Sequence, residues 1–145
     1  MSARCNRLAR LLAIRRLSED RDRRGLQSAM AAVAEVDREM ARQVDARGTA
    51  RSAARAAMAR GDRDEWLMAE AQDEVAGWNR QRLAGLLQVR AAEVPPARER
   101  FLASQLEHEQ VKQLVDDRRR VEREEENRRA QAAADDWFLA KREKP

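Results

Sequence analysis

The feature that most constrains this chain is that only one strong turn signal, Gly61–Asp62, interrupts long runs of helix-forming residues. Gly61 suits the left-handed position that closes a helix. Asp62 suits the N-cap of a following helix, and Glu65 stands where a reciprocal capping box would place it. A short connection between two long helices favours an antiparallel pair. We therefore predict an all-α chain, an antiparallel coiled-coil hairpin with helices at about residues 3–59 and 64–141 and a turn at about 60–63.

The composition agrees with long helices. Charged residues make up 39% of the chain and aromatic residues 3%, so the side chains that fill β-strands are scarce. Ala, Arg, Glu, Gln and Leu dominate, as in coiled coils. Disorder of the isolated chain is the alternative, since high charge and low hydropathy also describe unfolded proteins. The interspersed charge signs, the net charge of +4 and the regular apolar spacing favour helix.

The apolar residues of the first helix predict where it meets the second. A heptad pattern with gaps of four and three runs through Leu26, Met30, Val33, Asp37, Met40 and Val44, and extends back through Arg16 and Glu19 to Leu12 and Cys5. Residues 48–60 are rich in Ala and Arg. We expect that last stretch to bury little surface and to fray.

The second helix shows two apolar registers. The first contains Met68, Ala71, Val75 and Trp78, and the second contains Leu83, Leu87, Val94, Ala97, Phe101, His108, Val111 and Val115. The change of register predicts a phase slip near Gly77 and Gly85. Pro95–Pro96 either ends the helix at Val94 or kinks a continuous helix, and we favour the kink.

The last part of the chain is polar and then abruptly apolar. Residues 116–131 carry charge on every helical face, which is typical of a helix held by ion pairs rather than by a packed core. Trp137, Phe138 and Leu139 follow. These bulky residues either dock on another protein or cap the start of the first helix.

The chain offers few groups for chemistry. It contains one histidine and one cysteine, too few for a zinc site of the usual kind or for a recognisable catalytic triad, and it has no phosphate-binding loop. His108 falls on the predicted seam, where we interpret it as a polar packing residue rather than a general base. We predict a protein that is not an enzyme, with no catalytic, cofactor-binding or metal-binding residues and no small-molecule substrate.

The sequence also bears on location. No apolar run approaches the ~18 residues that span a membrane, no secretory signal is visible, and the single Cys5 fits a reducing compartment. We therefore expect a cytoplasmic protein. The basic N-terminal segment leaves nucleic-acid binding as a less favoured alternative, because acids dilute the arginines and no aromatic residue lies among them.

Four stretches resemble the YscO family of type III secretion coiled-coil proteins and its flagellar relative FliJ. The Leu- and Arg-rich start, RLARLLAIRRLSEDR, resembles the family's opening helix, and GDRDEWLMAEAQDEV resembles its turn and restart. RERFLASQLEHEQVKQLVDD resembles the spaced apolar stretch of the second helix. EEENRRAQAAADDWFLAKREKP resembles the closing segment, in which acids precede an aromatic near a basic C-terminus.

The resemblance implies a component of an export apparatus at the cytoplasmic face of the membrane, reaching the membrane only through partners. It implies a central stalk of the hexameric export ATPase, with ties to the export gate protein and to substrate chaperones as an escort. An ATPase-facing patch would comprise Leu8, Leu11, Leu12, Trp137 and Phe138 where the chain ends meet, and a gate-facing patch would comprise Trp66, Leu67, Val75 and Trp78. A homodimeric structural scaffold is the alternative. The sequence distinguishes neither injectisome from flagellum nor monomer from dimer.

Overall fold

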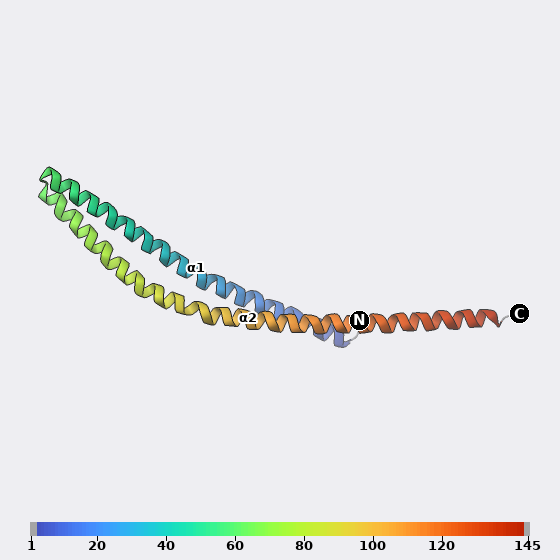
Figure 1. Ribbon diagram of the computed structural model, residues 1–145. Helices are drawn as coiled ribbons and strands as arrows, with labels where there is room; N and C mark the ends of the chain where they lie inside the picture. The colour runs from blue at the N-terminus through green and yellow to red at the C-terminus, as the bar shows by residue number, and fades with distance from the viewer. Residues whose placement is uncertain (1–2, 144–145) are drawn as a thin grey trace. The chain divides into compact units, whose positions relative to one another are not determined.

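The computed structural model describes residues 3–143, and it consists of two long helices that pack against each other as a hairpin. Helix α1 spans Ala3–Arg60 and helix α2 spans Arg63–Arg142 (Figure 1). The described residues contain no β-strand. The predicted fold class is confirmed, and the predicted helix boundaries lie within one residue of the observed ones.

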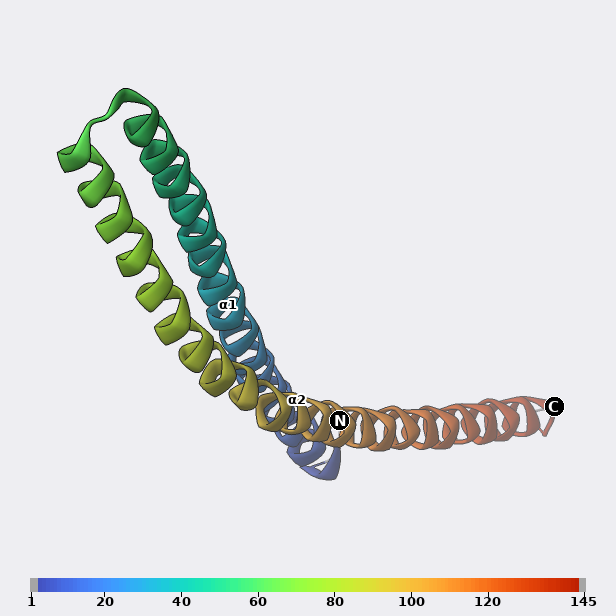
Figure 2. The ribbon, with the colours of Figure 1, turned by 60° about the vertical axis from the view of Figure 1, so that its left-hand side comes forward.

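The chain divides into two units. One, here called the terminal unit, pairs residues 3–21 with 102–143, and the other, the turn unit, comprises residues 22–101. In the turn unit the two helices run side by side in opposite directions from the connection at Gly61 (Figure 2). The units are described separately below.

The turn is built from two complementary caps. Gly61 has a φ of +71°, its N–H donates to the carbonyl of Met58 (3.2 Å), and the N–H of Asp62 donates to the carbonyl of Ala57 (3.0 Å). These two bonds make a Schellman motif that closes α1. The carboxylate of Asp62 accepts the backbone N–H of Glu65 at 3.1 Å, which caps α2.

The reciprocal half of the predicted capping box is wrong. The N–H of Asp62 is already used by α1, and the carboxylate of Glu65 instead accepts from Arg60 across the turn (2.5 Å). One amide therefore serves the end of α1 rather than the start of α2, and an ion pair joins the two helices at this end.

Helix α2 continues through Pro95 and Pro96. The alternative that the helix ends at Val94 is wrong. Both prolines are exposed, whereas Val94 is half-buried and Ala97 is buried. Because the proline rings lie away from the packed face, the helix loses two backbone hydrogen bonds there without losing its contact with α1.

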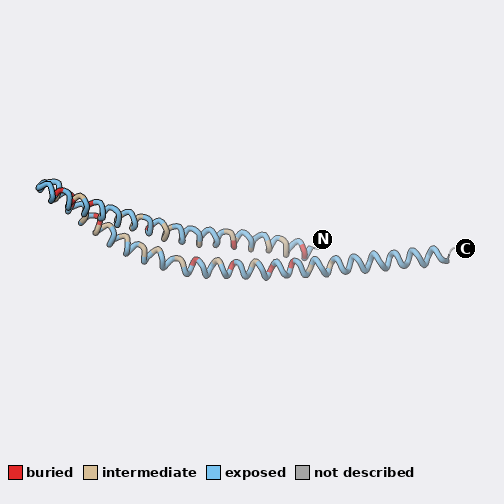
Figure 3. The backbone as a smooth tube through the Cα atoms, turned by 45° about the horizontal axis from the view of Figure 1, so that its top comes forward, coloured by how far each residue is buried: buried red, intermediate tan, exposed pale blue. Residues whose placement is uncertain are grey.

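Buried and half-buried positions form one seam along each helix, with gaps that alternate between three and four residues (Figure 3). In α1 the seam of the turn unit contains Leu26, Ala29, Val33, Val36, Met40, Gln43, Arg47, Ala50, Ala54 and Ala57. In α2 it contains Trp66, Ala69, Asp73, Ala76, Leu83, Leu87, Arg90, Val94, Ala97 and Phe101, and the one position of this pattern that is exposed is Arg80, between Ala76 and Leu83. This spacing is that of a heptad coiled coil.

The structure corrects part of the predicted register. Leu26, Val33 and Met40 are seam residues as expected, but Met30 and Val44 are 51% and 47% exposed. The alternate seam positions lie one residue earlier, and they hold Ala29, Val36 and Gln43. The helices thus pack at these positions through side chains other than the predicted Met30 and Val44.

The same correction applies to α2. The later register, from Leu83 to Val115, is confirmed, but the earlier set of Met68, Ala71, Val75 and Trp78 is exposed throughout. The seam lies two residues away, so no phase slip occurs near Gly77 or Gly85. The same heptad register holds on both sides of the exposed Arg80, from Trp66 to Ala76 and from Leu83 to Val115.

The Ala- and Arg-rich end of α1 is well packed, contrary to the expectation that it frays. Ala50, Ala54 and Ala57 have exposed fractions of 2%, 6% and 0%, and Ala69 and Ala76 of α2 are equally buried. Alanine methyl groups let two helix backbones come close, so burial here depends on proximity rather than on side-chain size.

Candidate protein-interaction surfaces

The seam of the terminal unit contains a buried polar layer. Glu19 is 6% exposed, and its carboxylate lies 2.5 Å from Nδ1 of His108. Beside it, Arg15 donates to Glu107 at 2.5 Å. His108 is therefore a seam residue, as predicted. A polar pair in an otherwise apolar seam stabilises one pairing register, because a shift would leave Glu19 buried without its partner.

The turn unit has a second polar layer. Nε of Arg47 donates to Oδ1 of Asp73 at 3.0 Å, and Nε of Arg51 lies 3.4 Å from the same oxygen. The hydrogen bond from Arg47 lowers the pKa of the Asp73 carboxyl, the charges of Arg47 and Arg51 lower it further, and desolvation opposes them. The same bond raises the pKa of Arg47. This layer thus joins α1 and α2 through charge rather than apolar burial.

Opposite the seam, α2 of the turn unit carries a row of exposed residues, here called the outer stripe. It contains Met68, Ala71, Val75, Trp78, Arg82, Gly85, Val89, Ala92 and Pro96. These positions also alternate in gaps of three and four, and they are displaced by two residues, about 200°, from the seam. Met68, Trp78 and Val89 are 65%, 62% and 56% exposed. A second heptad pattern on the far face is therefore left uncovered by the chain's own helices.

Met68, Ala71, Val75 and Trp78 were predicted as seam residues, but all four lie on the exposed outer stripe, and the second half of the stripe was not predicted. Val75 and Trp78 were expected on the turn-end patch, and both are exposed. Arg82, Gly85 and Val89 went unnoticed because a charge and a glycine interrupt the apolar pattern. Alternating gaps of four and three residues, counted onward from Trp78, would have predicted them.

The remaining residues of the predicted turn-end patch do not join this stripe. Trp66 is half-buried on the seam, in a small hollow at the turn together with Ala57 and Gly61. Leu67 is 48% exposed on a flank of α2. Since the four predicted residues lie on different faces of one helix, they do not form one patch.

The predicted patch at the chain ends is also divided. Leu8 and Leu12 are half-buried in the seam, and Leu11 is 37% exposed. If the pairing of Glu19 with His108 is continued, Leu8 lies level with about residue 119 of α2. Trp137 is a further ~18 residues along the helix, which corresponds to roughly 27 Å.

Residues 123–143 instead form an exposed segment of α2. Every residue in this range is solvent-exposed (Figure 3). Trp137 and Phe138 are 56% and 62% exposed, their rings meet edge-to-face at 5.1 Å, and Nζ of Lys141 lies 4.4 Å from the Trp137 ring centre. The suggestion that these aromatics cap the start of α1 is wrong. They are available to another molecule.

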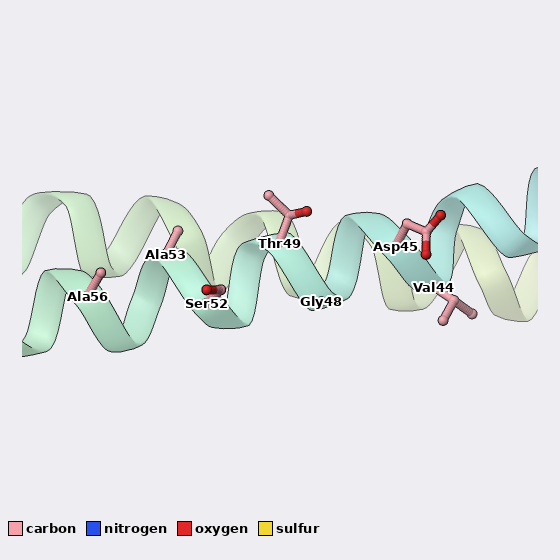
Figure 4. Close-up of a pocket in the computed structure, with 7 residues that line it drawn as sticks. All are labelled: Val44, Asp45, Gly48, Thr49, Ser52, Ala53 and Ala56. Atoms are coloured by element: carbon pink, nitrogen blue, oxygen red, sulfur yellow. The ribbon is translucent and has the colours of Figure 1, made fainter.

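Shallow hollows lie along the described helices. Figure 4 shows one along the outside of α1, where Gly48, Ser52 and Ala53 leave space between Val44 and Ala56. Another lies between the helices of the turn unit, where Val36, Leu83 and Leu86 are flanked by charged residues, namely Glu35, Glu39, Arg42 and Arg90. Among the described residues there is no cluster of His, Cys, Asp or Glu able to hold a metal ion.

Comparison with known proteins adds no assignment: no family model, curated protein or solved structure matches the chain. Within the described part of the sequence, neither helix contains a stretch both apolar and long enough to cross a lipid bilayer. Exposed apolar side chains lie on the outer stripe and at the end of α2.

Proposed function

We propose that this protein is a non-enzymatic component of a type III protein export apparatus. In this proposal it serves as the central stalk of the hexameric export ATPase, as an escort for substrate chaperones, or as both. The observation that carries the proposal is the helical hairpin itself, closed by the Gly61–Asp62 turn and extended at its C-terminus by an exposed helix ending in Trp137–Phe138. The sequence resemblance to the YscO and FliJ proteins supplies the partners.

The polar segment and its aromatic end suit an ATPase contact. Exposed tryptophan and phenylalanine are rare in a chain with 3% aromatic residues, and such residues dominate binding energy at protein interfaces. Both rings lie beyond the part of α2 that contacts α1. They can therefore be buried in a partner without disturbing the hairpin.

The export gate protein is the second proposed partner. The exposed side chains near the turn, Met58 and Leu67, are 67% and 48% exposed and lie at the opposite end of α1 from the N-terminus. A hairpin presenting different apolar groups at its turn and on its C-terminal segment suits a protein that contacts two components of a larger assembly. We propose that it acts at the cytoplasmic face of that apparatus.

Binding to the export ATPase that this proposal requires is the decisive test. We expect the wild-type chain to bind, and we expect Trp137→Ala with Phe138→Ala to weaken binding at least tenfold, or roughly 1.4 kcal/mol. The matched control is Leu114→Ala with Val121→Ala, because these residues are 56% and 39% exposed on the same helix. Wild-type protein that does not bind the ATPase rejects the stalk function. Equal binding by the aromatic variant rejects only the assigned contact.

A further inference from the structure

We propose that the outer stripe is a self-association surface, through which two copies of this chain pair α2 against α2 in antiparallel orientation. The stripe extends from Met68 to Pro96, four heptads, or on the order of 42 Å of helix. All of its members are exposed and lie within one unit. This inference goes beyond the proposed export function and does not depend on it.

The composition around the stripe is that of an interface rather than a solvated face. From Val75 to Val89 only Arg80 and Arg82 are charged, in a chain with 39% charged residues. Four of the positions that flank the stripe hold uncharged amides: Gln72, Asn79, Gln81 and Gln88. Depletion of charge together with exposed Trp and Met is the compositional mark of interface cores.

The distribution of charge identifies a second copy as the occupant. Leaving out the seam residues and the Asp62 cap, residues 63–79 carry four carboxylates and one arginine, whereas residues 81–98 carry two arginines and one carboxylate. Antiparallel pairing about residue 80 places the acidic segment of each α2 beside the basic segment of the other. Parallel pairing would place like charges together, which costs free energy. The surface is therefore complementary to itself under a twofold axis, as a dimer requires.

Side-chain sizes agree with the same register. Pairing about residue 80 places Met68 opposite the partner's Ala92 and Val75 opposite the partner's Gly85. Each larger side chain thus meets a small one, which lets the layers interdigitate. A Cβ built on Gly85 meets no atom within 4 Å, so the space that this register assigns to the partner's Val75 is open.

The layer nearest the twofold axis contains Arg82, the only charged residue of the stripe. In this register Trp78 lies opposite the partner's Arg82, and a guanidinium over an indole face is a favourable cation–π arrangement. The twofold axis generates this contact twice. Arg82 therefore supports the dimer rather than breaking its apolar layer.

The oligomeric state as a function of concentration tests the proposal. Sedimentation equilibrium of the full chain from about 1 to 200 µM should show the mass rising from 16.6 kDa toward twice that value. Trp78→Glu should raise the dimer dissociation constant at least 30-fold, as loss of an interface hot spot does. The matched control is Trp137→Glu, since Trp137 is similarly exposed (56% against 62%) and lies outside the stripe; it should dimerise as the wild type does.

Two further variants test the register. Gly85→Leu leaves the hairpin intact, because the site is open, but fills the space for the partner's Val75 and should weaken the dimer. In a Cys5→Ser background, Met68→Cys mixed with Ala92→Cys should form a disulfide between the two variants, whereas Met68→Cys alone should not. Circular dichroism checks that each variant remains helical.

Three results would overturn the proposal. A wild-type chain that stays monomeric at every concentration excludes the second copy, even if a helix of another protein binds the stripe. If the Trp78→Glu variant dimerises as the wild type does, the dimer interface lies elsewhere on the molecule. A disulfide formed by Met68→Cys with itself shows parallel pairing.

Discussion

The two units use the same heptad seam with side chains of different size. Near the turn, the buried residues of both helices are alanines, such as Ala54, Ala57 and Ala76. In the terminal unit they are larger, and Val115 and Cys5 are fully buried. Both seams carry a polar layer, Arg47–Asp73 in one unit and Glu19–His108 in the other.

The difference shows that burial and side-chain size are separate properties of a helix pair. Where alanines let the backbones approach closely, the larger residues have no room between the helices. Met68, Val75 and Trp78 accordingly face away from α1. These three large apolar side chains are thus left exposed, and four predictions test this contrast.

The largest effect is expected from enlarging the alanine seam. Ala57 is fully buried, so Ala57→Leu should force the helices apart and lower the free energy of unfolding by about 3 kcal/mol, measured by urea denaturation. Ala56→Leu, one residue earlier and exposed, should change it by less than about 0.5 kcal/mol. Equal effects at the two sites would show that the alanines are not in close contact.

The converse change in the terminal unit should have a somewhat smaller effect. Val115→Ala removes buried methyl groups and leaves a void, which should lower the free energy of unfolding by about 2 kcal/mol. Val121→Ala is the control, since Val121 is 39% exposed. A negligible loss at Val115 would mean that the larger seam is no better packed than the surface.

The turn connecting the alanine-rich segments should be sensitive to a single methyl group. Gly61 has positive φ, so Gly61→Ala should cost about 1–2 kcal/mol. Gly25→Ala should instead stabilise α1 by roughly 0.5–1 kcal/mol, because Gly25 lies within the helix and its added Cβ meets nothing. Thermal melts of the two variants should therefore shift in opposite directions.

The smallest effect is a change in acid stability from the polar layer of the turn unit. The pKa of Asp73 is lower in the folded chain than its ordinary value near 3.9, mainly because of the hydrogen bond from Arg47. The stabilisation is therefore present at neutral pH and is lost as the pH falls below about 4 and through the folded pKa. Asp73→Asn should show a smaller drop in urea midpoint between pH 7 and pH 3 than the wild type. Asp136→Asn, in the exposed segment, should behave as the wild type does.

Much of the fold followed from the sequence because its signals are local. Gly61 and Asp62 specified the turn through their own backbone preferences, and both hydrogen-bond as the cap motifs require. The later register of α2 also followed, because its apolar members, such as Leu83, Val94 and Val111, are half-buried or buried at heptad spacing. Local signals and size agreed there.

The register near the turn did not follow, because size and burial disagree there. Choosing the largest side chains selects Met68 and Trp78, but the helices pack through Ala69 and Ala76. Alanine is common on exposed helix faces as well, so its pattern carries little information by itself. The residues predicted to bind partners were chosen because they are large and apolar, and their division among several faces of the helices depends on the packing.

Pro95 and Pro96 have one more consequence for the outer face. Neither proline has an amide hydrogen, so the carbonyl groups of Ala91 and Ala92 lack the donors that a regular helix would supply. Both alanines are exposed. At Ala91 and Ala92 the main chain of α2 therefore offers two hydrogen-bond acceptors to its surroundings. Water or a donor side chain of a bound protein can hydrogen-bond to these carbonyls, and their availability does not depend on the side chains nearby.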